Sequence, residues 1–442
     1  MQGSNEGSDA AGDGHVSPAR AWFTVFVIVA MVVLAYIDRA VLSLFGPLVQ
    51  RDLLLSDNQM GLLYGLGFIA LLAAVTLIVG YAIDRCSRVA IMMTGLLLWS
   101  VMTALCAFAG SYPLLLLTRG GVGAGEATVG PAGYAIIGDL FPPERRGRAV
   151  GLVAAAVSVG SGIALMAGGG LLDAIGPDDL HVPLAGTMHN WQFGFLLLGL
   201  TGLPVALLLA TVRDPRKAGR STDGADDFPL LAYLARHRRI FAAIIGCTVL
   251  NVALGTGAMA WGPTMLVRSH GMAAADAGYL LGLMAVIGGV IGAPVSAELS
   301  DRWIRKGAPG GRLRGYALMF PLMLGGVLLA GAASSPVFVA AGYLAVNFAL
   351  AAVSALSYAA IQDVTPSPLR GQALAMLQFA ALLVGYGVGP SLVAFVTEIV
   401  LADHNRIGAA LIMLGVPMAL LGIILGCQGA RKVVPLRKGE FA

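Results

Sequence analysis

Charged residues are scarce in this sequence. They account for 12% of its 442 residues, whereas hydrophobic residues account for 57%. Because about a quarter of the residues in soluble domains are charged, this composition excludes an ordinary soluble protein. Apolar runs that reach the roughly 20 residues needed to cross hydrocarbon as a helix recur along the whole chain. The sequence therefore predicts an all-α membrane protein.

Several signatures of chemistry are also missing. The four cysteines form no CxxC pair and have no histidine nearby, so neither a disulfide framework nor a metal site is expected. No GxxxxGKS/T motif occurs, which disfavours transport driven directly by ATP. The expected spans contain no histidine, HExxH or Ser–His pair, which disfavours an intramembrane enzyme. A sensor is disfavoured because the tails are short, and no cofactor is expected.

Apolar runs predict twelve spans. Their expected limits are residues 21–49, 58–82, 89–110, 113–140, 148–173, 191–212, 240–267, 274–299, 314–333, 336–362, 369–400 and 406–428. The longest polar interval, 213–239, divides the spans six and six and is the expected linker. The predicted organisation is an N-terminal tail, a first six-helix bundle, this linker, a second six-helix bundle and a C-terminal tail, at 1–20, 21–212, 213–239, 240–428 and 429–442.

Lysine and arginine predict the orientation. Three of the 28 lie in loops on one side of the expected spans, two lie within spans, and the rest lie on the other side. By the positive-inside rule, both termini and the linker are expected in the cytoplasm, in a multi-pass protein of the plasma (inner) membrane. The N-terminal tail lacks the apolar region of a signal peptide and is expected to be disordered. A monomer is expected, and the net charge of +4 calls for no nucleic-acid partner.

The two predicted bundles share short motifs. GLLYGLGFIALLAAVTLIVGYAIDR, which ends at Arg85, parallels GYLLGLMAVIGGVIGAPVSAELSDR, which ends at Arg302. DLFPPERRGRA at 139–149 likewise parallels DVTPSPLRGQA at 363–373. Matched signals at matched places indicate a parallel repeat about an axis along the membrane normal, with a site between the halves near the midplane.

These motifs resemble those of the major facilitator superfamily. GYAIDRCSR at 80–88 resembles the cytoplasmic signature between spans 2 and 3, and RGGVGAGEA at 119–127 resembles the span 4 signature. YIDR in span 1, LLLLTRGGVGAGEA in span 4 and DLFPPERRGRA after it look most like the spinster subfamily. The resemblance implies two pseudo-symmetric six-helix bundles, alternating access and proton-coupled transport of lysophospholipids or sphingosine-1-phosphate-like lipids. We expect the loop residues to act in conformational gating or helix capping and not in cargo contact: Asp84, Arg85, Arg88, Asp301 and Arg302.

Four charged residues lie deep within the expected spans: Asp38 and Arg39 in the first, and Arg119 and Glu126 in the fourth. A charge at this depth costs several kcal/mol unless it faces water or a partner, so such residues indicate function. At about 1.5 Å per residue, Asp38 lies roughly 16 Å from the outer edge, Arg119 roughly 9 Å and Glu126 roughly 20 Å. Asp38 is therefore expected level with the gap between the other two, in a water-accessible cleft near the midplane.

This arrangement suggests a proton switch. An arginine beside Asp38 favours the carboxylate, whereas desolvation on closure of the cavity favours the neutral acid. We expect Asp38 to be the principal proton site, Glu126 the second, and Arg119 the protonation sensor or headgroup anchor; the spinster resemblance implies the same. Arg39 points about 100° away from Asp38 and is expected to be a gate or a structural partner. The plainer alternative is a structural ion pair that locks spans 1 and 4 together.

The second predicted bundle has no deep ionisable residue. A cavity charged on one wall and mostly apolar on the other suits an amphiphile such as a lysolipid. The candidates for contact with its headgroup or chain are Arg119, Arg39, Tyr36, Asn251, Asn347 and Tyr358. A drug/proton antiporter that exports lipophilic compounds stays open, because Asp38 followed nine residues later by Pro47 resembles the span 1 signature of that group.

Overall fold

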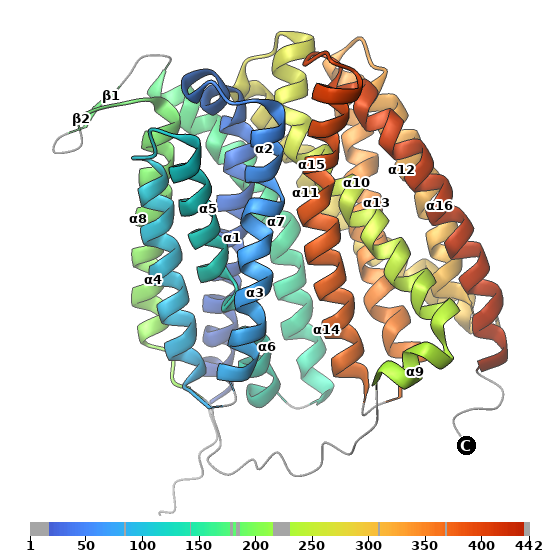
Figure 1. Cartoon of the computed structure of the whole chain (residues 1–442). Helices are drawn as coiled ribbons and strands as arrows, with labels where there is room; N and C mark the ends of the chain where they lie inside the picture. Colours follow the sequence, from blue (N-terminus) through green and yellow to red (C-terminus); the bar gives the residue numbers. More distant parts are fainter. Residues whose placement is uncertain are drawn as a thin grey trace, which may run out of the picture.

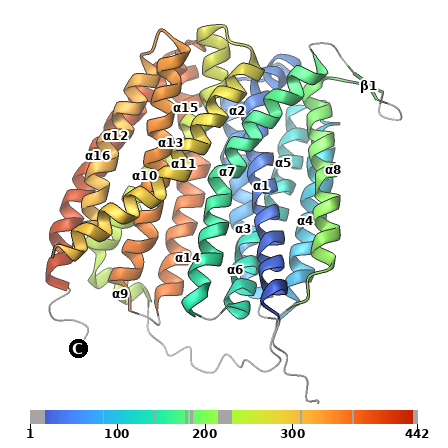
Figure 2. The same ribbon diagram turned by 180° about the vertical axis from the view of Figure 1, so that it is seen from behind.

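The structure is a computed structural model, and it describes residues 17–83, 85–141, 143–176, 180–182, 186–214, 230–307, 310–366 and 369–436. The described residues are almost entirely helical (Figures 1 and 2). Ten helices or helix runs among them are long and apolar enough to cross a membrane. The predicted all-α membrane fold is thus confirmed.

The first half of the chain contains eight helices and a short hairpin. They are α1 (Pro18–Leu53), α2 (Asp57–Tyr64), α3 (Leu66–Ala82), α4 (Arg88–Cys106), α5 (Tyr112–Glu126), α6 (Val129–Leu140), α7 (Pro143–Ile175), β1 (Leu180–Val182), β2 (Gly186–Met188) and α8 (Asn190–Ala210). The second half contains α9 (Leu230–Arg236), α10 (Arg238–His270), α11 (Ala274–Arg305), α12 (Gly311–Gly331), α13 (Pro336–Val364), α14 (Arg370–Ala380), the π-helix η2 (Ala381–Tyr386), α15 (Gly387–Phe395), the π-helix η3 (Val396–Val400) and α16 (Ile407–Leu436).

The two ends of the molecule are distinguished by the hairpin. Strands β1 and β2 pair antiparallel, with Leu180 opposite Met188, in a loop where no strand was expected. This hairpin lies at the end opposite to the start of α1 and the end of α16 (Figure 1). We call these the hairpin end and the tail end.

Three of the expected single spans are interrupted. The second span divides into α2 and α3 at Gly65, and the eleventh contains the two π-helical segments. The fourth divides into α5 and α6 directly after Glu126, where Thr128 donates its hydroxyl to the Gly125 carbonyl at 2.9 Å. A threonine hydroxyl that binds a backbone carbonyl competes with the helical hydrogen bonds and favours a break. The interruption places Glu126 at the end of α5.

The helices of the two halves lie side by side. Helices α1 to α8 occupy one side and α9 to α16 the other, with α7 against α11 where they meet (Figures 1 and 2). Small residues permit this contact, because a Cβ at Gly282 would lie only 2.6 Å from the Gly162 carbonyl oxygen. The bundle boundaries at 212 and 240 stay predictions.

Polar contacts join the halves at the hairpin end. Asp57 at the start of α2 has a fully buried carboxylate, and Arg268 of α10 donates to both of its oxygens, at 2.9 and 3.1 Å. Gln50 of α1 donates to Oδ1 of Asp57 at 2.8 Å, and Nδ1 of His404 lies 2.7 Å from Oδ2. We call Gln50, Asp57, Arg268 and His404 the hairpin-end latch. None of these four residues was expected at a site.

Gly65, between α2 and α3, lets the two halves approach each other closely. A Cβ at this position would lie 2.2 Å from the carbonyl oxygen of Gly387 in the second half. We expect Gly65→Ala to force α3 and α15 apart and to cost about 1–3 kcal/mol, the usual range for overpacking. Gly80→Ala within α3 is the control, because its Cβ would meet nothing within 4 Å. Thermal unfolding of both variants checks this, and equal melting temperatures would contradict it.

Candidate functional site

The predicted contact between α1 and α5 is present. Nη1 of Arg119 lies 2.5 Å from Oδ2 of Asp38. Thr103 of α4 donates its hydroxyl to the other carboxylate oxygen at 2.9 Å, so both oxygens of Asp38 are hydrogen-bonded. The side chains of Asp38 and Arg119 are 0% and 2% exposed.

A second ion pair lies beside the first. Nη2 and Nε of Arg39 donate to Oε2 of Glu126, at 2.6 and 2.8 Å. The Glu126 side chain is fully buried, whereas that of Arg39 is 20% exposed. Each acid is thus neutralised by the arginine of the other helix: Asp38 of α1 pairs with Arg119 of α5, and Glu126 of α5 pairs with Arg39 of α1.

The exposure of these side chains corrects one expectation. A water-accessible cleft was expected at the Asp38–Arg119 pair, but this pair is enclosed by the first half in the structure. Arg39, expected as a gate or a structural partner, is the more accessible cation and pairs with Glu126. Buried charges need both a partner and hydrogen bonds, and Thr103 supplies the bond that Arg119 alone cannot.

The hydrogen bonds distinguish the two acids. Oε1 of Glu126 is buried and has no hydrogen-bond partner among the described residues. Nε of Arg119 is likewise buried and unpaired within the part of the chain that the structure describes. An unpaired buried carboxylate oxygen is costly as an anion but suits a protonated acid, because the proton converts that oxygen into a neutral hydroxyl. Glu126 therefore has one carboxylate oxygen without a described donor, whereas both oxygens of Asp38 are hydrogen-bonded.

Aromatic residues surround the two arginines. The guanidinium carbon of Arg39 lies 4.8 Å from the ring centroid of Tyr36. The guanidinium carbons of Arg39 and Arg119 each lie 5.1 Å from the ring centroid of Phe68 on α3. Tyr386, the last residue of η2, packs from the second half against the buried cluster that contains Phe68. Neither Phe68 nor Tyr386 was expected at the site.

The remaining headgroup candidates lie within the second half. The amide of Asn251 on α10 donates to the Leu350 carbonyl at 3.1 Å, and that of Asn347 on α13 donates to the Tyr343 carbonyl at 2.9 Å. Both asparagines are buried; the Asn251 contact joins α10 to α13, whereas the Asn347 contact lies within α13. Tyr358 on α13 is 37% exposed and stays a candidate for cargo contact.

The gating candidates form contacts within one half each. Arg88 pairs with Asp139, and its backbone N–H donates to Asp214 at 2.8 Å. Arg85 is exposed and stacks on the ring of Tyr81. In the second half, Asp301 pairs with Arg312 at 2.6 Å, and Arg302 pairs with Glu298 at 2.8 Å. Asp84 lies outside the described residues.

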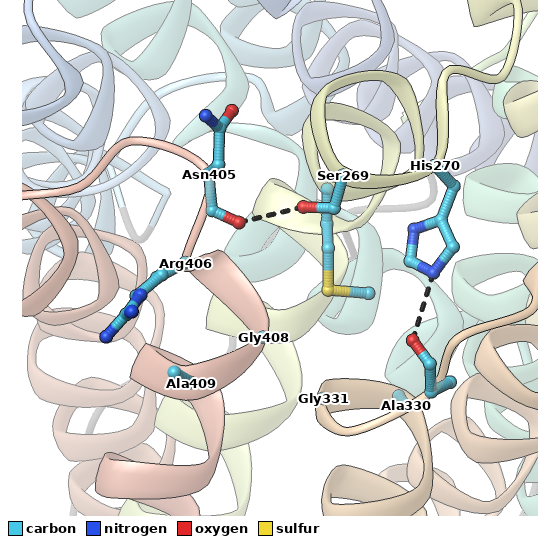
Figure 3. Close-up of a pocket in the computed structure, with 10 residues that line it drawn as sticks. Ser269, His270, Ala330, Gly331, Asn405, Arg406, Gly408 and Ala409 are labelled. Atoms are coloured by element: carbon cyan, nitrogen blue, oxygen red, sulfur yellow. Dashed lines mark hydrogen bonds between the residues drawn. The ribbon is translucent and has the colours of Figure 1, made fainter.

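A hollow of about 260 Å³ lies elsewhere, at the hairpin end of the second half (Figure 3). It is bordered by the ends of α10 and α12 and the start of α16. Ser269 donates to the Asn405 carbonyl at 2.9 Å, and Nε2 of His270 lies 3.2 Å from the Ala333 carbonyl oxygen. These side chains are occupied in capping helix ends and loops, and the four deep charges lie on other helices. We do not assign cargo to this hollow.

Comparison with known proteins defines the class. Residues 28–390 match the model of the Major Facilitator Superfamily, and the chain belongs to this family. Its members are transporters and not enzymes. An MFS-type efflux pump of Mycolicibacterium smegmatis is 28% identical over 416 residues, which cover 93% of each chain.

The chain is also similar to spinster proteins. Protein spinster of Drosophila melanogaster is 26% identical over 408 residues, which cover 87% of this chain and 63% of that protein. A bacterial homologue of the lysosomal transporter spinster, crystallised in an inward-facing, unoccupied conformation, has a TM-score of 0.77 and 21% identity and covers 97% of this chain. The likeness to spinster proteins thus extends along most of this chain, which spans somewhat more than half the length of the animal proteins.

Proposed function

We propose that this chain is a proton-coupled secondary transporter of a lysolipid or a sphingosine-1-phosphate-like amphiphile. The observation that carries the proposal is the presence of two ion pairs between α1 and α5 within the expected spans. Both acids and Arg119 are buried, and Arg39 is partly exposed. If the charges only held α1 and α5 together, one ion pair would be enough. In one pair both carboxylate oxygens are hydrogen-bonded, and in the other one carboxylate oxygen is unpaired among the described residues, so the two acids offer states that differ by one proton.

In the proposed mechanism, a proton on Oε1 of Glu126 weakens its attraction for Arg39. Arg39 is then available to an anionic or zwitterionic headgroup, because its side chain is the accessible one. Asp38 remains the principal coupling site of our proposal and loads a proton when the cycle exposes it and moves Arg119 away. The apolar chain of the cargo lies against the second half, where deep charges were not found in the sequence.

The proposed orientation places the tail end in the cytoplasm and the protein in the plasma (inner) membrane. Latch contacts close the hairpin end, and the gating candidates at the tail end contact only their own half among the described residues. We therefore propose that this conformation opens towards the cytoplasm. Alternating access then requires the latch to break.

Drug/proton antiport is the second candidate function. The similarity to an MFS-type efflux pump along nearly the whole chain favours it. The accessible Arg39 opposes a cationic drug, because protonation of Glu126 would leave the charge of this arginine without a counter-ion in a region of low dielectric.

A ligand panel separates these functions. We expect lysophosphatidylcholine or sphingosine-1-phosphate to raise the melting temperature more than tetraphenylphosphonium, and to do so unequally at pH 5.5 and pH 7.5. A ligand at 100 times its Kd stabilises the folded state by about 2.7 kcal/mol. Thermal unfolding in detergent measures this. Stabilisation by tetraphenylphosphonium alone would favour drug/proton antiport over lipid transport. Equal shifts of the melting temperature at both pH values would contradict proton coupling.

A further inference from the structure

The ring of Phe68 lies between the two ion pairs. It comes from α3, a helix that contributes no charge to the site, and it is 2% exposed. Its centroid is equally distant, 5.1 Å, from the guanidinium carbons of Arg39 and Arg119. Cations within about 6 Å of an aromatic centroid are attracted to the ring, most strongly when water is excluded.

The backbone of α5 makes room for this ring. Gly123 lies four residues after Arg119 and three before Glu126, so the three residues share one face of the helix. A Cβ at Gly123 would lie 3.3 Å from Cδ2 of Phe68 and 2.5 Å from the Phe68 carbonyl oxygen. The ring therefore sits on the glycine that separates the arginine of one pair from the glutamate of the other.

We propose that Phe68 is a positioning residue that keeps the two ion pairs separate. This inference rests on the proposed proton-coupled transport and names a residue that such coupling needs. Without the ring, Arg119 could bridge both carboxylates and satisfy Glu126 when Arg39 leaves. With the ring in place, release of Arg39 requires a proton on Glu126. Phe68 also gives the released guanidinium an aromatic surface together with Tyr36.

A double-mutant cycle tests the separation without any cargo. In the wild-type background, the changes in melting temperature caused by Asp38→Asn and Glu126→Gln should depart from additivity by less than about 1 °C, because the ring of Phe68 keeps the two pairs apart. In a Phe68→Leu background, they should depart from additivity by about 2 °C or more. Phe68→Tyr retains a ring and should restore additivity. Phe195→Leu removes another buried phenylalanine of the same half and is the matched control.

The outcomes are distinct. Additivity in both the wild-type and Phe68→Leu backgrounds, or its loss with Phe195→Leu as well, would overturn the role assigned to Phe68. In proteoliposomes, Phe68→Leu should keep counterflow of lysophosphatidylcholine while it reduces proton movement at least about ten-fold. A parallel loss of both would show a packing role only. Wild-type vesicles that exchange the lipid without moving protons would instead refute the proposed function, whatever the cycle gives.

Discussion

Replacing Arg119 with methionine is expected to destabilise the protein by about 3–5 kcal/mol, because it leaves the carboxylate of Asp38 buried without a cation. The pair is 0% and 2% exposed, so water cannot take over the role of the guanidinium. Asp38→Asn in the same chain should recover most of this loss, since a neutral amide needs no counter-ion. Thermal unfolding of the two single variants and the double variant measures the effect.

Arg51→Met is the control for this prediction. Arg51 pairs with Asp52 but its side chain is 71% exposed, so its loss should change stability by about 1 kcal/mol or less. If Arg119→Met matched this control, or if Asp38→Asn failed to rescue it, the buried pair would not carry the energy that its geometry indicates.

Replacing Asp57 with asparagine is expected to open the hairpin end. Asp57 accepts hydrogen bonds from Gln50 and Arg268, and loss of one partner of a buried charge pair costs about 2–5 kcal/mol. Because 1.4 kcal/mol is a factor of ten, the ratio of the state closed at this end to the state open there should fall by more than ten-fold. Spin labels at Ser111 and Ser334, in loops of the two halves at this end, report the opening as a longer distance.

This measurement requires two cysteine substitutions and a control variant. The exposed cysteines Cys86 and Cys427 are first replaced with serine, so that only the chosen positions carry labels. Asp403→Asn is the control, because Asp403 is 41% exposed and pairs with Arg406 within the same loop. Unchanged label distances in Asp57→Asn would show that apolar packing, and not the latch, closes this end.

Hydropathy and spacing predicted the parts of the structure that depend on burial of long apolar segments. Each expected span coincides with a helix or a run of helices, because a backbone in hydrocarbon must satisfy its own hydrogen bonds. The interruption at Gly65 was not predictable in the same way. Gly65 is one of 60 glycines, and what distinguishes it is its approach to the other half of the molecule.

The candidate site was predicted where charge identifies it. Depth along two helices was enough to bring Asp38 to Arg119, since charges inside spans seek partners. Arg39 was expected as a gate or a structural partner. It is the partner of Glu126, because a long arginine side chain can reach a neighbouring helix even where its Cα–Cβ bond points away from Asp38.

Neutral and peripheral residues gave no signal. Thr103 and Phe68 are ordinary within apolar spans, and only their contacts with the buried charges distinguish them. Asp57 and Arg268 lie near span ends, where charges are common and require no function. The exposed fraction of Asp38 depends on how the two halves are arranged. The same sequence can adopt several such arrangements, so the sequence alone does not predict whether Asp38 is enclosed.

Substrate-driven proton movement tests the central proposal most directly. Proteoliposomes that contain a pH-sensitive dye are supplied with lysophosphatidylcholine, and wild type, Asp38→Asn, Glu126→Gln and the exposed-acid control Asp276→Asn are compared. We predict that the lipid moves protons with wild type and Asp276→Asn, and that both buried-acid variants lose proton movement while they retain lipid exchange. Undiminished proton movement in Asp38→Asn and Glu126→Gln would contradict the assignment of these acids.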